Sequence, residues 1–568
     1  MLMRKTIENQ PAREFVASGG IGSSTSHDPP AAPETPSMSD RIPNRMTKDH
    51  EPARGVPPWS EAPIPQITAQ ARSAVDERRW NDFDDIVDDH LFALAIVAPS
   101  VLTDAWTRVP AQWLSEHPRH QLVAALTHAA AGSAAESRER ANLLFTRWVL
   151  RNDPPPVRDL LTVHAMEIRH HLVAGRFTRA GDAADDAERA LRDTADQTGL
   201  DDVLGVAMLH VGLARLAVAD VARATEAFAQ GWQWSAGDAP HPIAPSLAGF
   251  CALAHALADD AVEAEEWLAR SATSMTADAH DMAHRLRAAR ALAEALVAIA
   301  RLDPAAAESA LDRVMRGPEA GELWWVEIHA RARIAVLWGD RRAALYDVEN
   351  ALNSHPSQTP PSSLAGVLLR ADASDIHQSL GDLEAALRVL GPRERTTSHP
   401  SLATSAGRAL MIQGQFDEAV ALLEQAERER MPHTPETARW HLIRANVAHL
   451  SRFTHRAQII RDAAETVAQT QAFDAAFEAL PVVHQAIVAR TKLPGDGSAR
   501  FIPPPMIALT PREQQVLGLL VAHASVQEIA SAMHVSRNTA KTHLRVLYRK
   551  LGVSSRDEAL RVTTHLRR

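Results

Sequence analysis

Hydrophobic positions between residues 67 and 490 recur at helical spacing, and runs of β-branched residues are almost absent. Apolar residues three or four positions apart lie on one face of an α-helix. The region is rich in Ala, Leu, Arg and Glu, and breaks that contain Pro, such as residues 354–363, separate its helical segments. The pattern therefore predicts an all-α region built from many short helices.

A six-residue motif recurs along this region, with Gly first and Ala last in its four clear copies. Gly permits a tight turn after one helix, and the small Ala lets the next helix pack closely against it. A large apolar residue beside the turn, such as Phe177 or Phe416, is expected to close the hairpin. The clear copies span residues 175–180, 339–344, 381–386 and 414–419, and the weaker copies span residues 219–224, 259–264 and 302–307.

Successive copies of the motif begin between 33 and 44 residues apart, a period typical of solenoid proteins. We therefore expect seven or eight helical hairpins that stack into a curved solenoid, whose concave face suits a peptide, a protein or a small ligand. The alternative is a generic helical bundle with chance matches. Two Trp pairs fall inside the region and are expected in the core, with a ligand-binding role as the alternative; they are Trp232 with Trp234 and Trp324 with Trp325.

Four short helices are predicted in the last sixty residues, each opened by its own start signal. Ser or Thr at the first position accepts a backbone N–H, and Glu three residues later answers it. The start signals are Thr510 with Glu513, Ser525 with Glu528, Ser536, and Ser555 with Glu558. The second and third of these helices are joined by a turn of only a few residues.

The third of these helices has two chemically different faces. Its predicted buried stripe consists of Ala540, Leu544, Leu547 and Leu551. The opposite side carries Asn538, Thr542, Arg545 and Arg549, with Lys541 on its flank. Two helices joined by a short turn form a helix-turn-helix, whose second helix fits the major groove of DNA. The basic side of this helix is therefore predicted to read DNA.

The distribution of charge also sets the last sixty residues apart from the rest of the chain. From Thr510 to Arg568, ten Lys and Arg oppose four acidic residues, so this end carries +6 and the remainder −16 of the total −10. Such asymmetry suggests that one part meets a polyanion, although a basic face can also be merely solvated. The single cysteine, Cys251, excludes a disulfide framework, and no apolar run is long enough to span a bilayer. We expect a soluble cytoplasmic protein without a membrane segment.

The first residues have a composition that favours disorder, being rich in Pro, Ser, Gly and charge. Such a segment buries too little apolar surface to offset the entropy lost on ordering. Alternatively, Met38 or Met46 is the true start of translation. The predicted organisation is a disordered tail at 1–66, a helical solenoid at 67–490, a Pro-rich linker at 491–508 and a helix-turn-helix domain at 509–568.

Residues 509–560 resemble the LuxR/GerE-type DNA-binding domain, on the strength of "LTPRE", "EIA", "VSRNTAKTHL" and "YRKLGVSSRDEA". The resemblance covers about a tenth of the chain and implies a four-helix domain whose recognition helix, residues 537–550, enters the major groove of double-stranded DNA. The base-contacting residues that it implies are Lys541, Thr542 and Arg545. The residues that it implies for phosphate contact or for capping of the recognition helix are Ser536, Asn538, Thr539 and Arg549.

The preceding helical region resembles the tetratricopeptide-like part of large LuxR-family regulators, without their nucleotide-binding module. The chain contains no Gly-x4-Gly-Lys-Ser/Thr loop and no His-Glu-x-x-His spacing. We therefore expect no cofactor, no metal and no catalytic residue. The expected protein is a bacterial transcriptional regulator that binds DNA as a homodimer near the nucleoid, with RNA polymerase as a partner and a ligand or protein partner at the repeats. A protein-interaction scaffold with a vestigial helix-turn-helix is the alternative.

Overall fold

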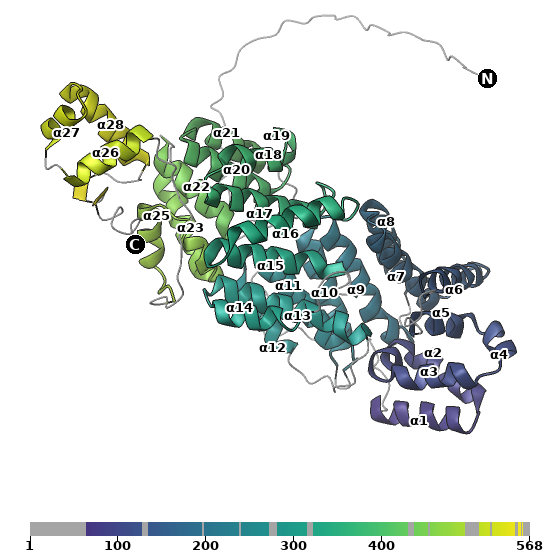
Figure 1. The fold of residues 1–568 in the computed structure, drawn as a ribbon. Coiled ribbons are helices and arrows are strands. Elements are labelled where there is room, and N and C mark those ends of the chain that lie inside the picture. Colours follow the sequence, from purple (N-terminus) through teal and green to yellow (C-terminus); the bar gives the residue numbers. More distant parts are fainter. Residues whose placement is uncertain are drawn as a thin grey trace, which may run out of the picture. The chain divides into compact units, whose positions relative to one another are not determined.

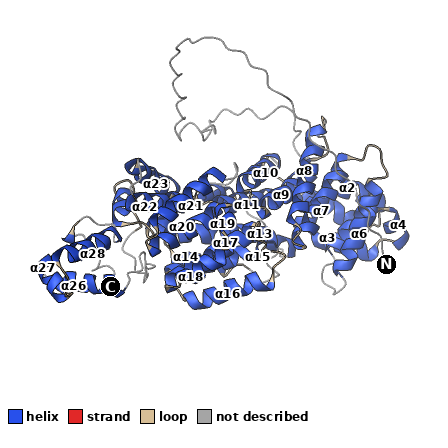
Figure 2. Ribbon diagram, turned by 90° about the horizontal axis from the view of Figure 1, so that it is seen from above, coloured by secondary structure: helices blue, strands red, loops and turns tan. Residues whose placement is uncertain are grey.

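The computed structural model describes most of the chain after residue 63, namely residues 64–127, 134–195, 198–237, 240–271, 281–314, 322–429, 437–451, 455–494, 511–522, 525–550, 555–557 and 559–560. Within these ranges it contains 28 α-helices and no strand (Figure 1; Figure 2). The all-α prediction is therefore confirmed for the described part of the chain. Most of the predicted tail and linker lies outside the described residues.

Six helices come first in the described chain: α1 (Ile64–Asp76), α2 (Trp80–Val97), α3 (Pro99–Arg108), α4 (Ala111–Glu116), α5 (Pro118–Thr127) and α6 (Ala134–Val149). Helix α2 is interrupted at His90, whose φ of −136° and ψ of 31° break the helical hydrogen-bond ladder. The carboxylate of Asp202 accepts the N–H groups of Phe92 (2.7 Å) and Ala93 (2.9 Å) just after this break. One buried carboxylate thus replaces the missing helical acceptors and ties α2 to α9.

No single helix among the described residues has both the length and the apolar composition needed to cross a membrane. Helices α2 and α3 together satisfy that test of length and composition, with a bend of 119° between them.

The central region is an array of helical hairpins that follow one another in chain order. Its helices are α7 (Val157–Val173), α8 (Phe177–Asp193), α9 (Asp201–Ala217), α10 (Val221–Ser235), α11 (Ala244–Leu257), α12 (Ala261–Arg270), α13 (Asp281–Ala300), α14 (Pro304–Leu311), α15 (Trp324–Leu337), α16 (Arg341–Ser354), α17 (Leu364–Leu380), α18 (Leu383–Leu390), α19 (Arg393–Thr397), α20 (Pro400–Gln413), α21 (Phe416–Glu429), α22 (Ala438–Leu450), α23 (Arg456–Thr470), α24 (Phe473–Ala476) and α25 (Pro481–Val488).

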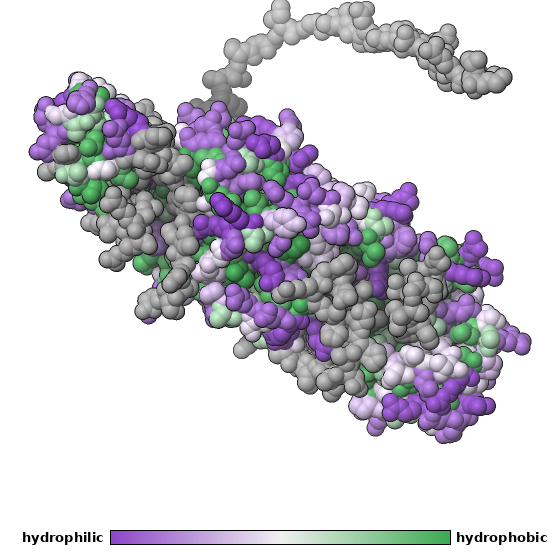
Figure 3. Space-filling model, in the orientation of Figure 1, coloured by the Kyte–Doolittle hydropathy of each residue, from purple (hydrophilic) through white to green (hydrophobic). Residues whose placement is uncertain are grey.

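Eight hairpins can be followed in the described part of this array. They are α7–α8, α9–α10, α11–α12, α13–α14, α15–α16, α17–α18, α20–α21 and α22–α23. The first helix of each hairpin also contacts the first helix of the next one. This stacking of neighbours is the arrangement that buries a continuous core in repeat proteins. On the face drawn in Figure 3, outside the grey atoms, hydrophobic residues form scattered patches between hydrophilic ones.

All seven copies of the six-residue motif lie at the turns inside hairpins, between α7 and α8 for the first and between α20 and α21 for the last. The Ala that ends each copy is buried, from Ala180 to Ala419. In six copies the first residue adopts a left-handed backbone with positive φ, and Gly339 is the exception. The three weak copies place Ala219, Asp259 and Leu302 there. The turn geometry therefore persists where the Gly that favours it has been lost.

A further signal in the motif, which the sequence interpretation missed, is Asp at its second position. In five hairpins the carboxylate of this Asp accepts a backbone N–H two or three residues later and caps the second helix. The five residues are Asp220, Asp260, Asp303, Asp340 and Asp382. Asp at the N-terminus of a helix satisfies an otherwise unpaired donor. The motif does not occur in the sequence between the helices of the last hairpin, α22–α23, and therefore did not indicate it.

A buried cluster of charged side chains connects five helices of the array. Arg333 of α15 lies 3.4 Å from Asp375 of α17 and 3.4 Å from Asp474 of α24. Arg408 of α20 lies 3.4 Å from Glu478. Arg439 of α22 pairs with the same Asp474. Burial by itself raises the pKa of the Glu478 carboxyl. The positive charges of the three arginines lower it by a larger amount, so that the net pKa shift is downward.

Segments far apart in the sequence also meet in the array. The turn before α17 lies on the turn between α7 and α8, where the amide of Gln358 donates to the carbonyl of Val173 (3.3 Å). The two turns are so close that a Cβ added to Gly175 would lie 2.2 Å from the carbonyl oxygen of Ser357. Helix α24 contacts α13, and the guanidinium of Arg439 in α22 donates to the carboxylate of Asp259 (3.1 Å), in the turn between α11 and α12. These contacts bring late hairpins against early ones.

Replacement of Gly by Ala should change the stability in opposite directions at a left-handed turn and within a helix. Gly381 has φ of +85°, and a Cβ added there meets nothing within 4 Å, so Gly381→Ala tests backbone conformation alone. We expect this substitution to cost about 1–2 kcal/mol, since L-residues are strained in the left-handed region. Gly181→Ala, in helix α8 with equally open space, should instead stabilise by about 0.5–1 kcal/mol. Urea unfolding midpoints check both, and shifts of the same sign would contradict the turn assignment.

Acidification should destabilise the array through His399. This residue caps α20, where its Nδ1 accepts the N–H of Ser401 (3.2 Å), and burial lowers its pKa to about 4. The unfolded chain then takes up a proton near the ordinary pKa of 6.5, but the folded protein does not do so until about pH 4. Stability present at pH 7 is therefore lost as pH falls through this window, by up to roughly 3 kcal/mol.

The matched variant is His399→Asn, because Asn can cap a helix and does not titrate. Chemical unfolding at pH 7 and pH 4.5 should give a smaller acid-induced loss for this variant than for the wild type. An equal loss in both proteins would exclude His399 as a source of acid sensitivity.

Candidate nucleic-acid interface

The last described helices form a small unit around their own core. They are α26 (Pro511–Ala522), α27 (Val526–Ala532) and α28 (Arg537–Lys550). Buried side chains from all three meet in this core, together with Met533 just after α27 and Ala559 beyond α28; the residues within the helices are Val516, Leu520, Ile529, Leu544 and Leu547. Of the predicted fourth helix, the structure describes residues 555–557 and 559–560, and those after Ser555 are helical.

The start of α27 follows the sequence prediction closely. The hydroxyl of Ser525 accepts the N–H of Glu528 (3.2 Å), and the carboxylate of Glu528 accepts the N–H of Ser525 (3.1 Å). Two backbone donors that the helix leaves unpaired are satisfied in this way. The other two predicted pairs, Thr510 with Glu513 and Ser555 with Glu558, each have one member outside the described residues, namely Thr510 and Glu558.

The turn between α27 and α28 is tight and has a defined hydrogen-bond pattern. His534 adopts a left-handed backbone with φ of 54°, and the N–H of Val535 reaches back to the carbonyl of Ala530 (3.0 Å). This is the 6→1 bond that closes many helix C-termini. Ser536 then accepts the N–H of Thr539 (3.1 Å) at the start of α28. The angle between the two helices is therefore set by paired backbone groups.

Helix α28 presents the two faces that its sequence predicts. Ala540, Leu544 and Leu547 are buried, and Leu551 lies outside the described residues. On the other side, Lys541, Thr542 and Arg545 are exposed, and so are the residues at its start: Ser536, Asn538 and Thr539. Arg549 belongs to the helix, but its side chain lies outside the described part of the structure. The exposed side thus combines long cationic side chains with short polar ones.

Hydrogen bonds already occupy some groups on this face. The hydroxyl of the exposed residue Thr542 donates to the carbonyl of Asn538 (3.0 Å), so its hydrogen is already used and its oxygen can only accept. The hydroxyls of Ser536 and Thr539 lie 2.8 Å apart. Lys541 and Arg545 stand one helical turn apart. The two cations are thus placed to meet acceptors that lie side by side.

Two of the basic residues in this unit stabilise its fold. The guanidinium of Arg556 donates to the carbonyl of Leu520 (2.7 Å) at the end of α26. Arg512 reaches the carbonyl of Met533 (3.5 Å), beside the turn. Burial raises the pKa of the Tyr548 phenol, which packs at the edge of the core. The sequence interpretation counted both arginines only as charge and could not assign these contacts.

Comparison with known proteins identifies this unit. The family described as bacterial regulatory proteins, luxR family, matches residues 508–563. These residues form a luxR-family helix-turn-helix domain. The LuxR-type domain accounts for the capping box, the tight turn and the two-faced helix α28.

Curated relatives of the LuxR-type domain include two proteins named HTH-type transcriptional regulator MalT, from Yersinia pestis (strain Pestoides F) and from Yersinia pseudotuberculosis serotype O:1b (strain IP 31758). Each is 48% identical to this chain over 58 residues. The match covers 10% of this chain and 6% of each relative. The matched segment is therefore a small part of this chain and of each of these relatives.

The capping box should stabilise α27 locally within the LuxR-type domain. Replacing Ser525 by Ala removes one member of the box, which typically costs about 1 kcal/mol. Amide hydrogen exchange of α27 in the full-length protein should therefore accelerate roughly fivefold. Ser531→Ala is the matched control, since the Ser531 hydroxyl only bonds the carbonyl of Gln527 within the helix (3.0 Å). Equal acceleration by both substitutions would show that the box contributes nothing.

Proposed function

We propose that this protein is a sequence-specific DNA-binding transcriptional regulator. The observation that carries the proposal is the exposed, cationic and polar side of α28 within a luxR-family domain. The second helix of a helix-turn-helix lies in the major groove, where each base pair presents a distinct pattern of donors and acceptors. Helix α28, residues 537–550, is accordingly the recognition helix.

Lys541, Thr542 and Arg545 are proposed to read bases. All three are exposed on one side of α28. The donor-only side chains of Lys and Arg suit the N7 and O6 acceptors of guanine. The methyl group of Thr542 remains available for a thymine methyl, because its hydroxyl already donates to the backbone.

The remaining polar residues are proposed to fix the helix on the DNA backbone. Asn538 and Arg549 are assigned to phosphate, which contributes affinity and register but no sequence information. Ser536 and Thr539 are assigned to the start of the helix, where Ser536 accepts a backbone N–H. Helix N-termini favour phosphate because their N–H groups and dipole face it.

The rest of the chain is proposed to supply the signal. The predicted division stands as part of this proposal: a disordered tail at 1–66, a tetratricopeptide-like helical solenoid at 67–490 that receives a ligand or protein partner, a linker at 491–508 and the LuxR-type domain at 509–568. The protein acts by binding, without catalysis or cofactor. It works in the cytoplasm on the nucleoid, as a homodimer on two half-sites about one helical turn apart, with RNA polymerase as its further partner.

Substitutions on α28 should separate base reading from phosphate binding. Arg545→Ala should cost roughly 1–3 kcal/mol and relax the preference at one base pair per half-site. Arg549→Ala should weaken all sequences alike and reduce the salt slope by about one unit per chain. Selection from a randomised double-stranded library, followed by binding assays across salt concentrations, measures both effects. Footprints on the selected sites report the number of half-sites.

Arg545→Ala with an unchanged base preference would overturn the assignment of the reading face. A wild-type protein that selects no sequence from the library would favour the alternative, a protein-interaction scaffold whose helix-turn-helix is vestigial.

A further inference from the structure

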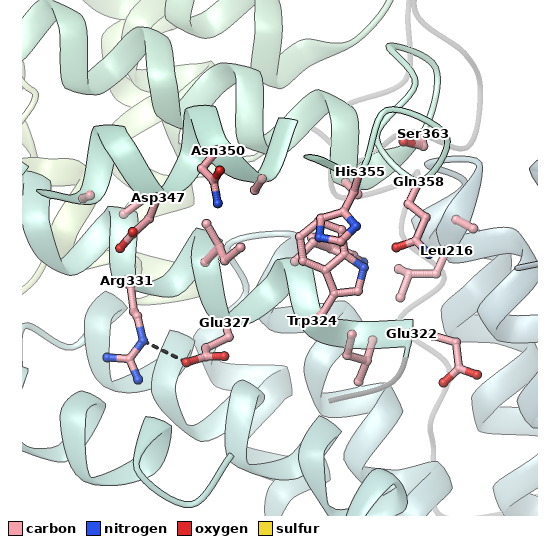
Figure 4. A pocket seen from close by; sticks show the side chains of 18 of the residues that line it. Leu216, Glu322, Trp324, Glu327, Arg331, Asp347, Asn350, His355, Gln358 and Ser363 are labelled. Carbon is pink, nitrogen blue, oxygen red and sulfur yellow. Dashed lines mark hydrogen bonds and ion pairs between the residues drawn. The ribbon is translucent and has the colours of Figure 1, made fainter. Parts of the chain in front are cut away.

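A cavity of about 830 Å³ lies in the hairpin array, between α7, α8 and α9 on one side and α14, α15, α16 and α17 on the other (Figure 4). Volumes of this order suit small organic ligands. The hydrogen bond between Gln358 and Val173 joins the two sides at one border. The cavity therefore exists because late hairpins of the array return to early ones.

The charged side chains that line the cavity are mostly acidic. They are Glu308, Glu322, Glu327, Asp340 and Asp347, against the single cation Arg331. Five negative charges and one positive charge give the lining a net charge of −4, with His355 counted as uncharged. Charge of one sign in a concave site with apolar walls raises the local concentration of counter-ions. The electrostatics of the cavity thus favour a cation and disfavour an anion.

Several of these charges are already used within the protein. Arg331 donates through its Nε to Glu327 (2.9 Å), an ion pair marked in Figure 4, so that the only cation of the lining is already neutralised by one of the acids, although its buried Nη2 makes no hydrogen bond with any described residue. Asp340 caps α16. Glu322 has Arg169 as a distant partner at 3.8 Å. Among the described residues, Asp347 makes no hydrogen bond or ion pair with another side chain. Asp347 and Glu322 therefore retain capacity for a bound cation.

An aromatic pair stands between these two carboxylates. The rings of Trp324 and His355 lie with centroids 4.6 Å apart, and Figure 4 shows Asp347 on one side of the pair and Glu322 on the other. Trp is the best aromatic side chain for contact with a cation. Apolar surface is available beside it, since Val173 lines the cavity and is 59% exposed. The cavity thus offers carboxylate, aromatic and aliphatic contacts together.

We infer that this cavity binds a small organic cation, namely a protonated amine that carries an apolar body. The ammonium group is held by Glu322 or Asp347 and by the face of Trp324, and the apolar body lies against α7 and α9. The binding itself is independent of DNA contact. That the bound amine is the signal for the LuxR-type domain rests on the proposed function.

Three probes of nearly equal size and different charge test the inference on the full-length protein. They are phenethylamine, 2-phenylethanol and 3-phenylpropionate, each titrated by calorimetry at pH 7. The amine is expected to bind at least tenfold more tightly than the alcohol, and the carboxylate more weakly still. Glu322→Gln combined with Asp347→Asn should weaken amine binding at least tenfold while leaving binding of the alcohol unchanged.

The control substitution is Glu349→Gln, on the same helix as Asp347 but outside the cavity, where Glu349 faces His377 (3.4 Å). This variant should bind the amine like the wild type. Circular dichroism and the unfolding temperature identify any variant that fails to fold. In that case Trp324→Phe, which keeps an aromatic face, provides the second test. It is expected to weaken amine binding about threefold. The inference is overturned if the amine does not bind, if either analogue binds as tightly, or if the double substitution leaves its affinity unchanged.

The outcome can be told apart from failure of the proposed function. Arg545→Ala should bind the amine normally, since it changes only the LuxR-type domain. Amine binding without any selected DNA sequence would support the cavity site and contradict the proposal that the protein is a sequence-specific regulator. A selected DNA sequence with no amine binding would do the opposite.

Discussion

Close approach of two helices across a short turn is the constraint on which the hairpin array depends. The small buried Ala at the end of each turn motif, such as Ala180 or Ala419, leaves room for the neighbouring helix. The left-handed residue at the start of most of the motifs reverses the chain within three residues. Because each hairpin buries its remaining apolar face on the next one, a defect in one turn affects both neighbours.

Stacking in chain order does not by itself fix where late hairpins meet early ones. In this protein that meeting depends on polar contacts, including the bond from Gln358 to Val173 and the buried cluster of Arg333, Arg408 and Arg439 with carboxylates. A buried ion pair contributes little net stability, but removal of one partner leaves an uncompensated charge. The cluster therefore strongly disfavours other arrangements of α15, α20, α22 and α24. Helix α15, which contributes Arg333 to this cluster, also lines the cavity together with α9.

The structure of the LuxR-type domain, unlike that of the array, is determined mostly by interactions between residues close together in the sequence. Capping at Ser525 and Ser536, the tight turn at His534 and the apolar stripe of α28 all involve residues within a few positions of one another. The face opposite that stripe is left to solvent by geometry alone. A site of this kind can be found in a sequence, whereas a cavity lined by four or more hairpins cannot.

The sequence by itself determined the all-α fold, seven of the eight hairpins and the exposed face of α28, because each depends on helical period, turn residues and caps that are adjacent in the chain. It did not indicate the hairpin α22–α23, whose turn lacks the motif. Only the tertiary structure decided that both Trp324 and the buried Trp325 line a cavity. It likewise brought Asp347 and Glu322 to either side of one aromatic pair. Such placements depend on contacts between segments as far apart as α7 and α17, and helical periodicity carries no information about them.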